Sequence, residues 1–347
     1  MKVAFNSLPL KTEHKTRGIG FYTRNLLADL LQRPDIEIQE FSDISEIKKV
    51  DVVHYPFFDL FLRSLPIIKK FPTIVTIHDV IPLIFPRHYP PGIKGFLNNL
   101  YQKMALKNVS AIITDSENSK KDIQKFLKVD DGKIFPVYLA PADYFRPIKD
   151  KKRLESVSLK YHLPNKFAFY VGSVNWNKNL LNMTAACVKA DIDLVLAGKD
   201  FEDKLNLYHP EKRSYAEFLK KFESHSKVHI LGFIPDEDLA VIMNLSKVIL
   251  LPSFYEGFGL PILEAQACGT PVITSNVSSM PEIAGKGTIL VDPNSVGEIA
   301  QAIREIINDQ KSRKNLIDKG LENIQRFSWE KTIKETIKVY QYAVCTK

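Results

Sequence analysis

The chain has 347 residues, which is too long for one ordinary hydrophobic core and favours about two domains. Its 45% hydrophobic and 25% charged residues are typical of a globular protein, and no apolar run approaches the roughly 18 residues that a membrane span requires. The formal net charge of +8 suits a diphosphate, an anionic lipid or nucleic acid, but no nucleic-acid-binding motif accompanies it, so no nucleic-acid partner is expected.

The first residues and the cysteines exclude further classes. The sequence MKVAFNSLPLKTEHK lacks the extended apolar core and cleavage site of a signal peptide, so we expect a cytoplasmic protein. Cys187, Cys268 and Cys345 are far apart and form neither a zinc-ligand nor a disulfide pattern.

The first half of the chain alternates apolar runs with helical or loop segments. It begins with a predicted strand at Lys2–Asn6, a glycine turn at residues 17–20 (RGIG) and an amphipathic helix at Phe21–Gln32. Gly18 and Gly20 would let a ligand approach the backbone at the positive end of that helix. The alternation predicts βαβ units and a parallel sheet. The further predicted strands are Ile36–Phe41, Val50–His54, Thr73–Ile77, Ala111–Thr114 and Lys133–Val137.

Polar residues directly follow two of these predicted strands. His78 and Asp79 come after the run TIVTI, while Asp115 and Ser116, with Ser119 beyond them, come after AIIT. Functional side chains collect at the carboxyl ends of parallel strands, so His78 is a candidate to contact substrate hydroxyls. The alternative is a surface histidine bonded to a local carbonyl.

Between these two positions, Phe85–Lys107 is a proline-broken loop followed by a helix that mixes aromatic residues with lysines. Such a segment can rest on a membrane surface, because aromatic side chains enter the interface while lysines meet anionic headgroups. The alternative is a helix packed on its own domain.

A proline-containing segment without periodicity, Pro136–Arg153, is predicted to be a linker. After it the alternation resumes and predicts a second doubly wound sheet. The predicted strands are Phe167–Val171, Ile192–Ala197, Val228–Ile230, Lys247–Leu251 and Pro271–Thr274, and the predicted helices are Ser295–Asn308, Lys311–Ile324 and a last one ending near Ala343.

The loop at residues 172–179 (GSVNWNKN) supplies Gly172, Ser173 and Lys178 at the end of a predicted strand. An ammonium near a helix N-terminus suits a diphosphate. Asp191 and Asp193 have the spacing of a DxD metal motif, but strand alternation sends both to one side of a strand entry. A solvated strand entry is therefore expected, and no metal is assigned.

The stretch from Ser253 to Thr274 (SFYEGFGLPILEAQACGTPVIT) places two carboxylates and two glycines around a helix start. Pro261 suits the first helical position and Gly269 the end, so Pro261–Cys268 is predicted to be a helix. Backbone amides would cluster at its positive end, a geometry suited to phosphate or to polar groups of a sugar. These amides belong to Gly257, Phe258, Gly259 and Leu260.

Glu256 lies in this loop, and Glu264 is placed in the first helical turn. Carboxylates accept hydrogen bonds from vicinal hydroxyls, so the pair suggests a nucleotide-sugar, with one carboxylate for the sugar and one for the ribose. The alternative for Glu264 is a purely structural residue, since the helix dipole alone favours an acid in a first turn.

Glu256-x7-Glu264, with GFGLP between the acids and EAQACGTPVI after them, closely resembles the signature of the retaining glycosyltransferases of family 4. The resemblance spans nearly the whole chain. It implies an α/β protein of GT-B architecture, in which two doubly wound Rossmann-like domains face each other across a cleft that holds the site. Residues 1–150 would form the acceptor domain and 151–329 the donor domain, with a terminal helix at about 330–347 crossing back onto the first.

The same resemblance implies roles for individual residues. Glu256, His78 and Lys178 would be catalytic. Residues 232–235 (GFIP), with Phe233, resemble the loop whose backbone holds the nucleotide base. Because Phe21 and Asn177 stand where many members have arginine, the diphosphate contact is expected to rest on Lys178. The expected donor-binding set is Gly18, Gly20, Gly172, Ser173, Lys178, Phe233, Glu256, Gly257, Phe258, Gly259, Leu260 and Glu264.

The implied activity is retaining, metal-independent transfer of a hexose from a nucleotide-sugar to a glycan or lipid-linked acceptor, without a cofactor. GDP-mannose is the favoured donor, because TIHDVIPLIFPRHYP resembles mannosyltransferase-like members, and a UDP-sugar stays open. The protein is expected in the cytoplasm, with peripheral contact to the inner membrane face as an open alternative. The alternatives are a nucleotide-sugar epimerase of the same architecture and a non-catalytic sugar-nucleotide-binding module.

Overall fold

The computed structural model of the chain describes residues 1–12, 15, 18–202, 207 and 210–346. The chain divides into two units. Unit 1 consists of Met1–Ala140 together with Phe327–Lys347, and unit 2 is Pro141–Arg326. Arg17, in the predicted glycine turn, lies outside the described residues.

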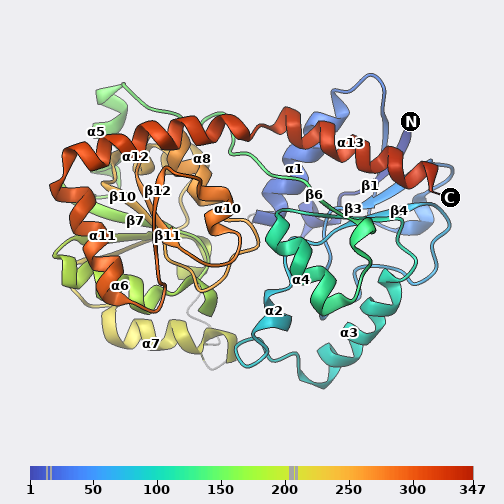
Figure 1. Ribbon diagram of the computed structural model, residues 1–347, viewed down its shortest axis with the longest axis horizontal. Helices are drawn as coiled ribbons and strands as arrows, with labels where there is room; N and C mark the ends of the chain where they lie inside the picture. Colours follow the sequence, from blue (N-terminus) through green and yellow to red (C-terminus); the bar gives the residue numbers. More distant parts are fainter. Residues whose placement is uncertain (13–14, 16–17, 203–206, 208–209, 347) are drawn as a thin grey trace. The chain divides into compact units, whose positions relative to one another are not determined.

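Unit 1 is built on a six-stranded parallel sheet in the order β2-β1-β3-β4-β5-β6 (Figure 1). Every residue of β3, β4 and β5 is buried, as in parallel sheets that are covered on both faces. The order reverses between β1 and β3, and the loops at such a switch point are where doubly wound sheets bind ligands. The strands are β1 (Lys2–Asn6), β2 (Glu37–Phe41), β3 (Val52–Tyr55), β4 (Thr73–Thr76), β5 (Ala111–Thr114) and β6 (Ile134–Pro136).

The helices of unit 1 come from both ends of the chain. The C-terminal helix α13 contacts β3, β4, β5 and α1, so the last residues complete a domain that the first residues begin. Ser328 caps α13 by accepting a hydrogen bond from the amide of Lys331 (3.2 Å). The helices are α1 (Gly18–Leu31), α2 (Ile81–Ile84), α3 (Gly92–Leu106), α4 (Glu117–Leu127) and α13 (Trp329–Cys345).

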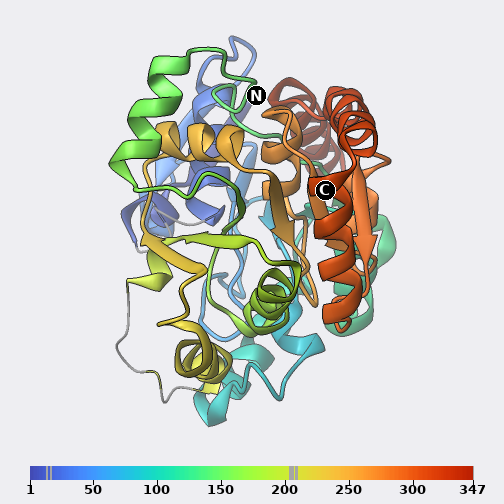
Figure 2. The ribbon, with the colours of Figure 1, turned by 90° about the vertical axis from the view of Figure 1, so that its left-hand side faces the viewer.

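Unit 2 has a second six-stranded parallel sheet, in the order β12-β11-β10-β7-β8-β9, with helices on both sides (Figure 2). In this sheet the order reverses between β7 and β10. The strands are β7 (Phe167–Val171), β8 (Asp193–Ala197), β9 (Val228–Gly232), β10 (Val248–Leu251), β11 (Val272–Ser275) and β12 (Thr288–Val291). The helices are α5 (Lys151–Lys160), α6 (Leu180–Ala190), α7 (Arg213–Phe222), α8 (Asp236–Leu245), α9 (Leu260–Ala267), α10 (Met280–Ala284), α11 (Val296–Asn308) and α12 (Gln310–Asn323).

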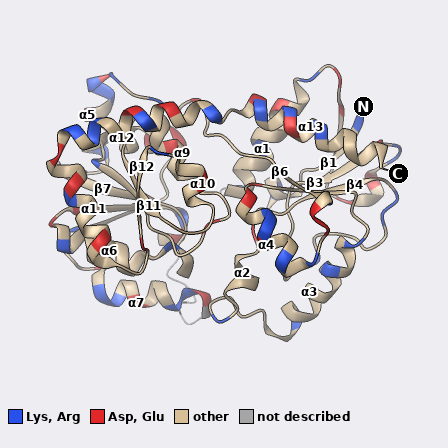
Figure 3. Cartoon of the chain, viewed as in Figure 1, with Lys and Arg blue, Asp and Glu red and all other residues tan. Residues whose placement is uncertain are grey.

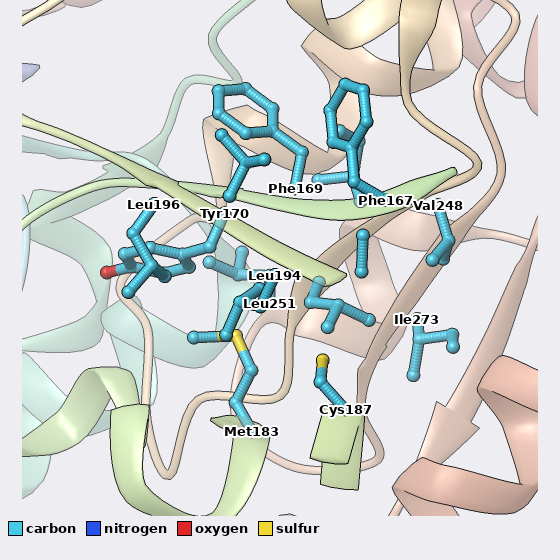
Figure 4. Packing of buried hydrophobic residues seen from close by; sticks show 14 of the residues in the cluster. Phe167, Phe169, Tyr170, Met183, Cys187, Leu194, Leu196, Val248, Leu251 and Ile273 are labelled. Atoms are coloured by element: carbon cyan, nitrogen blue, oxygen red, sulfur yellow. The ribbon is translucent and has the colours of Figure 1, made fainter. Parts of the chain in front are cut away.

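The core of unit 2 lies between this sheet and its helices. Met183 and Cys187 of α6 point toward the strand residues Leu194 and Leu251, and all four side chains are buried (Figure 4). Deleting one such large side chain from a packed core costs about 2–5 kcal/mol. The loops at the edge of the sheet therefore extend from a tightly packed core.

The predicted α/β class with two doubly wound parallel sheets is confirmed. Three differences concern short segments. Helix α1 includes Gly18 and Gly20, which were predicted to lie in a turn before it. Residues 151–153, predicted as linker, open α5, because Asp150 accepts hydrogen bonds from two amides of that helix. The sequence did not predict α2, α10 or β12, which have only four or five residues each. Within the described part of the chain, no helix is both long and apolar enough to cross a membrane.

Candidate active site

The switch point of unit 2 brings together two loops that the sequence singled out. The loop after β7 ends in a single 3-10 turn, Trp176–Lys178, and the loop after β10 contains Glu256. Because β7 and β10 are hydrogen-bonded neighbours, the two loops leave the same edge of the sheet side by side. The sheet order thus brings together two chain positions 78 residues apart.

Lys178 and Glu256 form an ion pair at this edge. Nζ of Lys178 donates to both carboxylate oxygens of Glu256, each at 2.8 Å. The Glu256 side chain is only 9% exposed and that of Lys178 is 20% exposed. A nearly buried carboxylate requires such a partner, since an unpaired buried charge is strongly unfavourable. The pair fixes the predicted sugar-binding carboxylate beside the predicted phosphate-binding ammonium.

Hydrogen bonds join the two loops independently of that ion pair. Nδ2 of Asn177 donates to the carbonyl of Tyr255 (2.8 Å), and the Asn177 carbonyl accepts from the amide of Phe254 (2.7 Å). The rings of Trp176 and Phe254 stack with centroids 4.8 Å apart. Asn177 is buried and its amide is directed at the neighbouring loop, so position 177 serves to hold the loops in register.

The turn before α9 is held in a conformation that favours glycine. Gly259 has φ +100°, in the left-handed region that side chains disfavour. The hydroxyl of Ser279 donates to the carbonyls of Glu256 (2.9 Å) and Phe258 (3.0 Å). In the first turn of α9, Pro261 has no amide hydrogen and the amide of Ile262 donates to the Gly259 carbonyl (2.9 Å). Anion binding here would therefore depend on the amide of Leu260 and on the loop, including Gly257.

The placement of Glu264 in the first turn of the helix was wrong. Helix α9 begins at Leu260, so Glu264 lies in its second turn, and no acid is present in the first. The charge of the helix terminus therefore offers little support there, since that effect fades within one turn. Burial, with a smaller contribution from the charge of Asp236, raises the pKa of Glu264 to about 8. The group is held in an apolar setting that disfavours its ionised form.

Three other predicted donor-binding residues follow β7 and β9, which are separated by β8 in the sheet. A Cβ on Gly172 would stand 2.6 Å from the hydroxyl oxygen of Tyr170, so only glycine fits there. The same Tyr170 hydroxyl donates to the carbonyl of Ser173 (2.6 Å). Phe233, after β9, has a half-exposed ring, and its amide donates to Glu202 Oε1 (2.9 Å). A base contact through that amide would therefore compete with Glu202.

In unit 1, Gly18 and Gly20 belong to α1. Gly18 is exposed, and a Cβ there would meet nothing within 4 Å. Phe21 packs against the ring of Trp329 with centroids 6.0 Å apart. The phenylalanine that replaces an expected arginine thus contributes to the α1–α13 interface.

His78 follows β4 and pairs with Asp115, which follows β5. Nδ1 of His78 lies 2.8 Å from Oδ2 of Asp115. Burial alone would lower the pKa of His78, but the Asp115 carboxylate, with a smaller effect from Asp79, makes the net shift upward. The Pro56 carbonyl is close enough to raise this pKa further, yet Nε2 of His78 has no hydrogen bond of acceptable geometry within the described residues. One ring nitrogen is thus held by a carboxylate, while the other is a buried atom near the Pro56 carbonyl.

A buried polar chain behind His78 was missed by sequence reasoning. The ring of Tyr22 packs edge-on against His78 (4.9 Å between centroids), and its hydroxyl lies 3.1 Å from Oγ1 of Thr76. Thr76 bonds Nε2 of His54, and Nδ1 of His54 bonds the hydroxyl of Tyr340 on α13, each at 2.8 Å. Burial lowers the pKa of His54 to about 3, so this histidine is neutral. These hydrogen bonds connect Tyr340 of the C-terminal helix to Tyr22, whose ring packs against His78.

The two aspartates of the DxD spacing have partners at the sheet edge. Asp191 pairs with Lys227 and Asp193 with Nε2 of His229, each at 2.8 Å. Both belong to the entry of β8, opposite to the strand ends that carry Lys178 and Glu256. Over the described ranges, no three His, Cys, Asp or Glu side chains lie together as a metal site requires.

Comparison with known proteins identifies the chain as a whole. Residues 14–140 match the family described as Glycosyltransferase Family 4, and residues 151–323 match Glycosyl transferases group 1. O-antigen chain mannosyltransferase B of Escherichia coli is 30% identical over 276 residues, which cover 77% of this chain and 70% of that relative. The chain belongs to the family 4 glycosyltransferases.

Further matches of this glycosyltransferase differ in extent. The serotype-specific mannosyltransferase WbdA of Escherichia coli is 27% identical over 75% of this chain, which spans only 32% of WbdA. Anabaena Alr3699/HepE, solved in complex with UDP and glucose, matches with a TM-score of 0.74 at 16% identity, covering 97% of this chain and 98% of that one. The structural match extends the GT-B fold to both units of this glycosyltransferase. The chain is therefore an enzyme that transfers a sugar.

Proposed function

We propose that this glycosyltransferase moves mannose from GDP-mannose to a hydroxyl of a glycan or lipid-linked glycan, with retention of configuration and without a metal ion. The observation that carries the proposal is the Lys178–Glu256 pair at the switch point of unit 2. Mannose is favoured by the 30% identity to O-antigen chain mannosyltransferase B. Retention is supported by the resemblance of the Glu256–Glu264 stretch to the signature of the retaining family 4 enzymes.

In this proposal Lys178 supplies the positive charge for the leaving diphosphate, because an ammonium placed in advance stabilises charge as it develops. Amides of Gly18 and Gly20, in α1, would add fixed dipoles. Glu256 would accept hydrogen bonds from hydroxyls of the transferred sugar, and Glu264 from those of the ribose. The remaining donor contacts would come from Gly172, Ser173, Phe233 and the loop Gly257–Leu260.

The transfer step needs no protein nucleophile. The bond between the anomeric carbon and the phosphate oxygen breaks, and the acceptor oxygen bonds to the same face of that carbon. The acceptor proton passes to the leaving phosphate oxygen. His78 would contact a hydroxyl of donor or acceptor.

Glu256→Gln tests this assignment. The amide keeps the shape of the side chain but loses the charge that pairs with Lys178, so we expect turnover to fall by roughly a hundredfold or more. Mass spectrometry of the acceptor product measures transfer, and circular dichroism checks the fold. The matched control is Glu217→Gln, which changes an exposed glutamate paired with Lys221. Near-normal transfer by Glu256→Gln would refute the role of Glu256.

The donor is tested separately by thermal unfolding with GDP-mannose, GDP, UDP-glucose and UDP. A ligand of the native state raises the unfolding temperature, and at equal concentration a tighter ligand raises it more. We expect the largest rise with the two guanine nucleotides. A rise confined to the uracil nucleotides would assign a UDP-sugar donor, as in the UDP and glucose complex of HepE.

A further inference from the structure

Helix α3 of unit 1 presents an apolar face to solvent. The stripe residues Ile93, Phe96, Leu97, Leu100 and Met104 are each between 46% and 85% exposed. Their spacing of three and four residues puts them on one side of the helix. Monomeric proteins rarely leave a contiguous apolar surface uncovered unless it binds something. We call these five residues the α3 stripe.

The opposite face of α3 is polar and buried, which fixes the orientation of the stripe. Asn98 Nδ2 donates to the Phe61 carbonyl (2.9 Å), and Asn99 Nδ2 donates to the Leu60 carbonyl (3.1 Å). Gln102 Nε2 donates to the Asp59 carbonyl (2.7 Å). Turning the helix to bury its apolar residues would break these buried hydrogen bonds, each worth about 1 kcal/mol or more. The exposure of the stripe is therefore built into the fold.

The segment that receives these hydrogen bonds also exposes apolar side chains. Leu62 is 60% exposed and Ile68 is 80% exposed, both on the stretch that runs from β3 to β4. Arg63 lies over the ring of Tyr101 on α3 (4.7 Å). Apolar and cationic side chains from two neighbouring segments thus share this region.

The charged side chains of α3 and its flanking residues are all positive. Residues 80–114 contain no Asp or Glu, whereas Lys94, Lys103 and Lys107 belong to α3 or directly follow it. Figure 3 shows lysines (blue) but no Asp or Glu (red) on α3. Two copies of this surface placed face to face would oppose like charges, which argues against a second copy as the occupant. An anionic layer with an apolar interior complements both the lysines and the stripe.

We propose that the α3 stripe docks on an anionic lipid surface, with its apolar side chains in the interface and the adjoining lysines at the headgroups. An amphipathic helix of this kind lies in the plane of the interface rather than across the bilayer. Unlike the donor and the transfer step, this property needs neither Lys178 nor Glu256.

Sedimentation of the full chain with vesicles tests the proposal. We expect binding to equimolar phosphatidylcholine and phosphatidylglycerol, and at least about tenfold weaker binding to phosphatidylcholine alone. Combining Ile93→Ser, Phe96→Ser and Leu97→Ser should weaken binding to the anionic vesicles by about tenfold or more. Lys94→Gln should weaken it by about fivefold, with less effect at high salt. Leu159→Ser, which alters an equally exposed helical leucine on α5, should bind as the unaltered chain does.

Light scattering and thermal unfolding complete the design. The stripe side chains are exposed, so the triple variant should unfold at the same temperature as the unaltered chain. Failure of the unaltered chain to bind the anionic vesicles would overturn the proposal, as would equal binding by a folded triple variant. A dimer that the triple variant converts to a monomer, without vesicle binding, would assign the stripe to a second copy instead.

Discussion

Glu264 shows how burial changes the chemistry of a single residue. It is 8% exposed, and its pKa is raised to about 8 by burial. An acid whose pKa is higher in the folded state than in the unfolded state costs no stability at pH values below the unfolded pKa, near 4.5. As the pH rises from there toward 8, the unfolded chain ionises more readily and the folded state loses stability.

Glu264→Gln should remove this pH dependence. We expect the variant and the unaltered protein to unfold at similar temperatures below about pH 4.5. At pH 9 the variant should be more stable, because its amide is not ionised in either state. Thermal unfolding at a series of pH values measures the difference, with Glu217→Gln as an exposed control. A stability difference independent of pH would show that Glu264 keeps its ordinary pKa.

The sequence singled out candidate site residues, but it did not reveal the contacts between them. Glu256 and Lys178 were found from local motifs, but their ion pair depends on β10 lying beside β7, which local patterns do not reveal. His78 was likewise found from its place after a strand. Its partner Asp115 and the supporting His54–Tyr340 bond involve positions 37 and 286 residues apart. No local signal marks such pairs.

Among the elements, the paired loops after β7 and β10 act as one structure. Asn177 joins them through its side chain and its carbonyl, while Asn179 Nδ2 reaches the Pro252 carbonyl (2.8 Å). The loop after β7 thus helps to position Glu256, which belongs to the loop after β10. Asn177 is buried, so a longer arginine at this position could not occupy the same space while bonding the Tyr255 carbonyl.

Asn177→Ala should loosen this arrangement. Loss of the bond from Nδ2 to the Tyr255 carbonyl should lower the free energy of unfolding by about 1–2 kcal/mol. It should also raise KM for the donor several-fold, because Glu256 follows Tyr255 directly. Steady-state kinetics and urea unfolding measure the two effects. Asn182→Ala removes a similar bond, to the Pro293 carbonyl (3.1 Å), outside the Glu256 loop. Equal changes in KM for both variants would contradict a specific role of Asn177.

Element boundaries followed the sequence closely where strands are buried and apolar. The predicted strands Lys2–Asn6, Ala111–Thr114 and Phe167–Val171 match the structure residue for residue. Helix starts were harder to place, because glycine is read as a turn signal even where it belongs to α1. Helix α3 conformed to its helical period, yet its sequence alone did not reveal that the apolar side faces out.

At the scale of the whole molecule, unit 1 is discontinuous and unit 2 is continuous. The side chains of α13 complete the core of unit 1, where Tyr340 is fully buried. Thr332 Oγ1 donates to the Tyr138 carbonyl (2.6 Å), and the rings of Tyr138 and Phe327 are 5.8 Å apart between centroids. The ends of the two segments of unit 1 therefore lie close together. Unit 2 keeps its own sheet, core and helices between Pro141 and Arg326.

This connectivity predicts different behaviour for three fragments. Residues 141–326 should fold alone and show a cooperative thermal transition. Residues 1–140 should not, because removing α13 exposes the sheet face that it covers and leaves Nδ1 of the buried His54 without its partner. Residues 1–140 joined to 327–347 by a short glycine–serine linker should regain cooperative unfolding. The linker has only a short distance to span, because Tyr138 lies beside Phe327. Circular dichroism on heating distinguishes the three cases. Cooperative unfolding of residues 1–140 at the temperature of the joined fragment would show that α13 contributes nothing to the stability of unit 1.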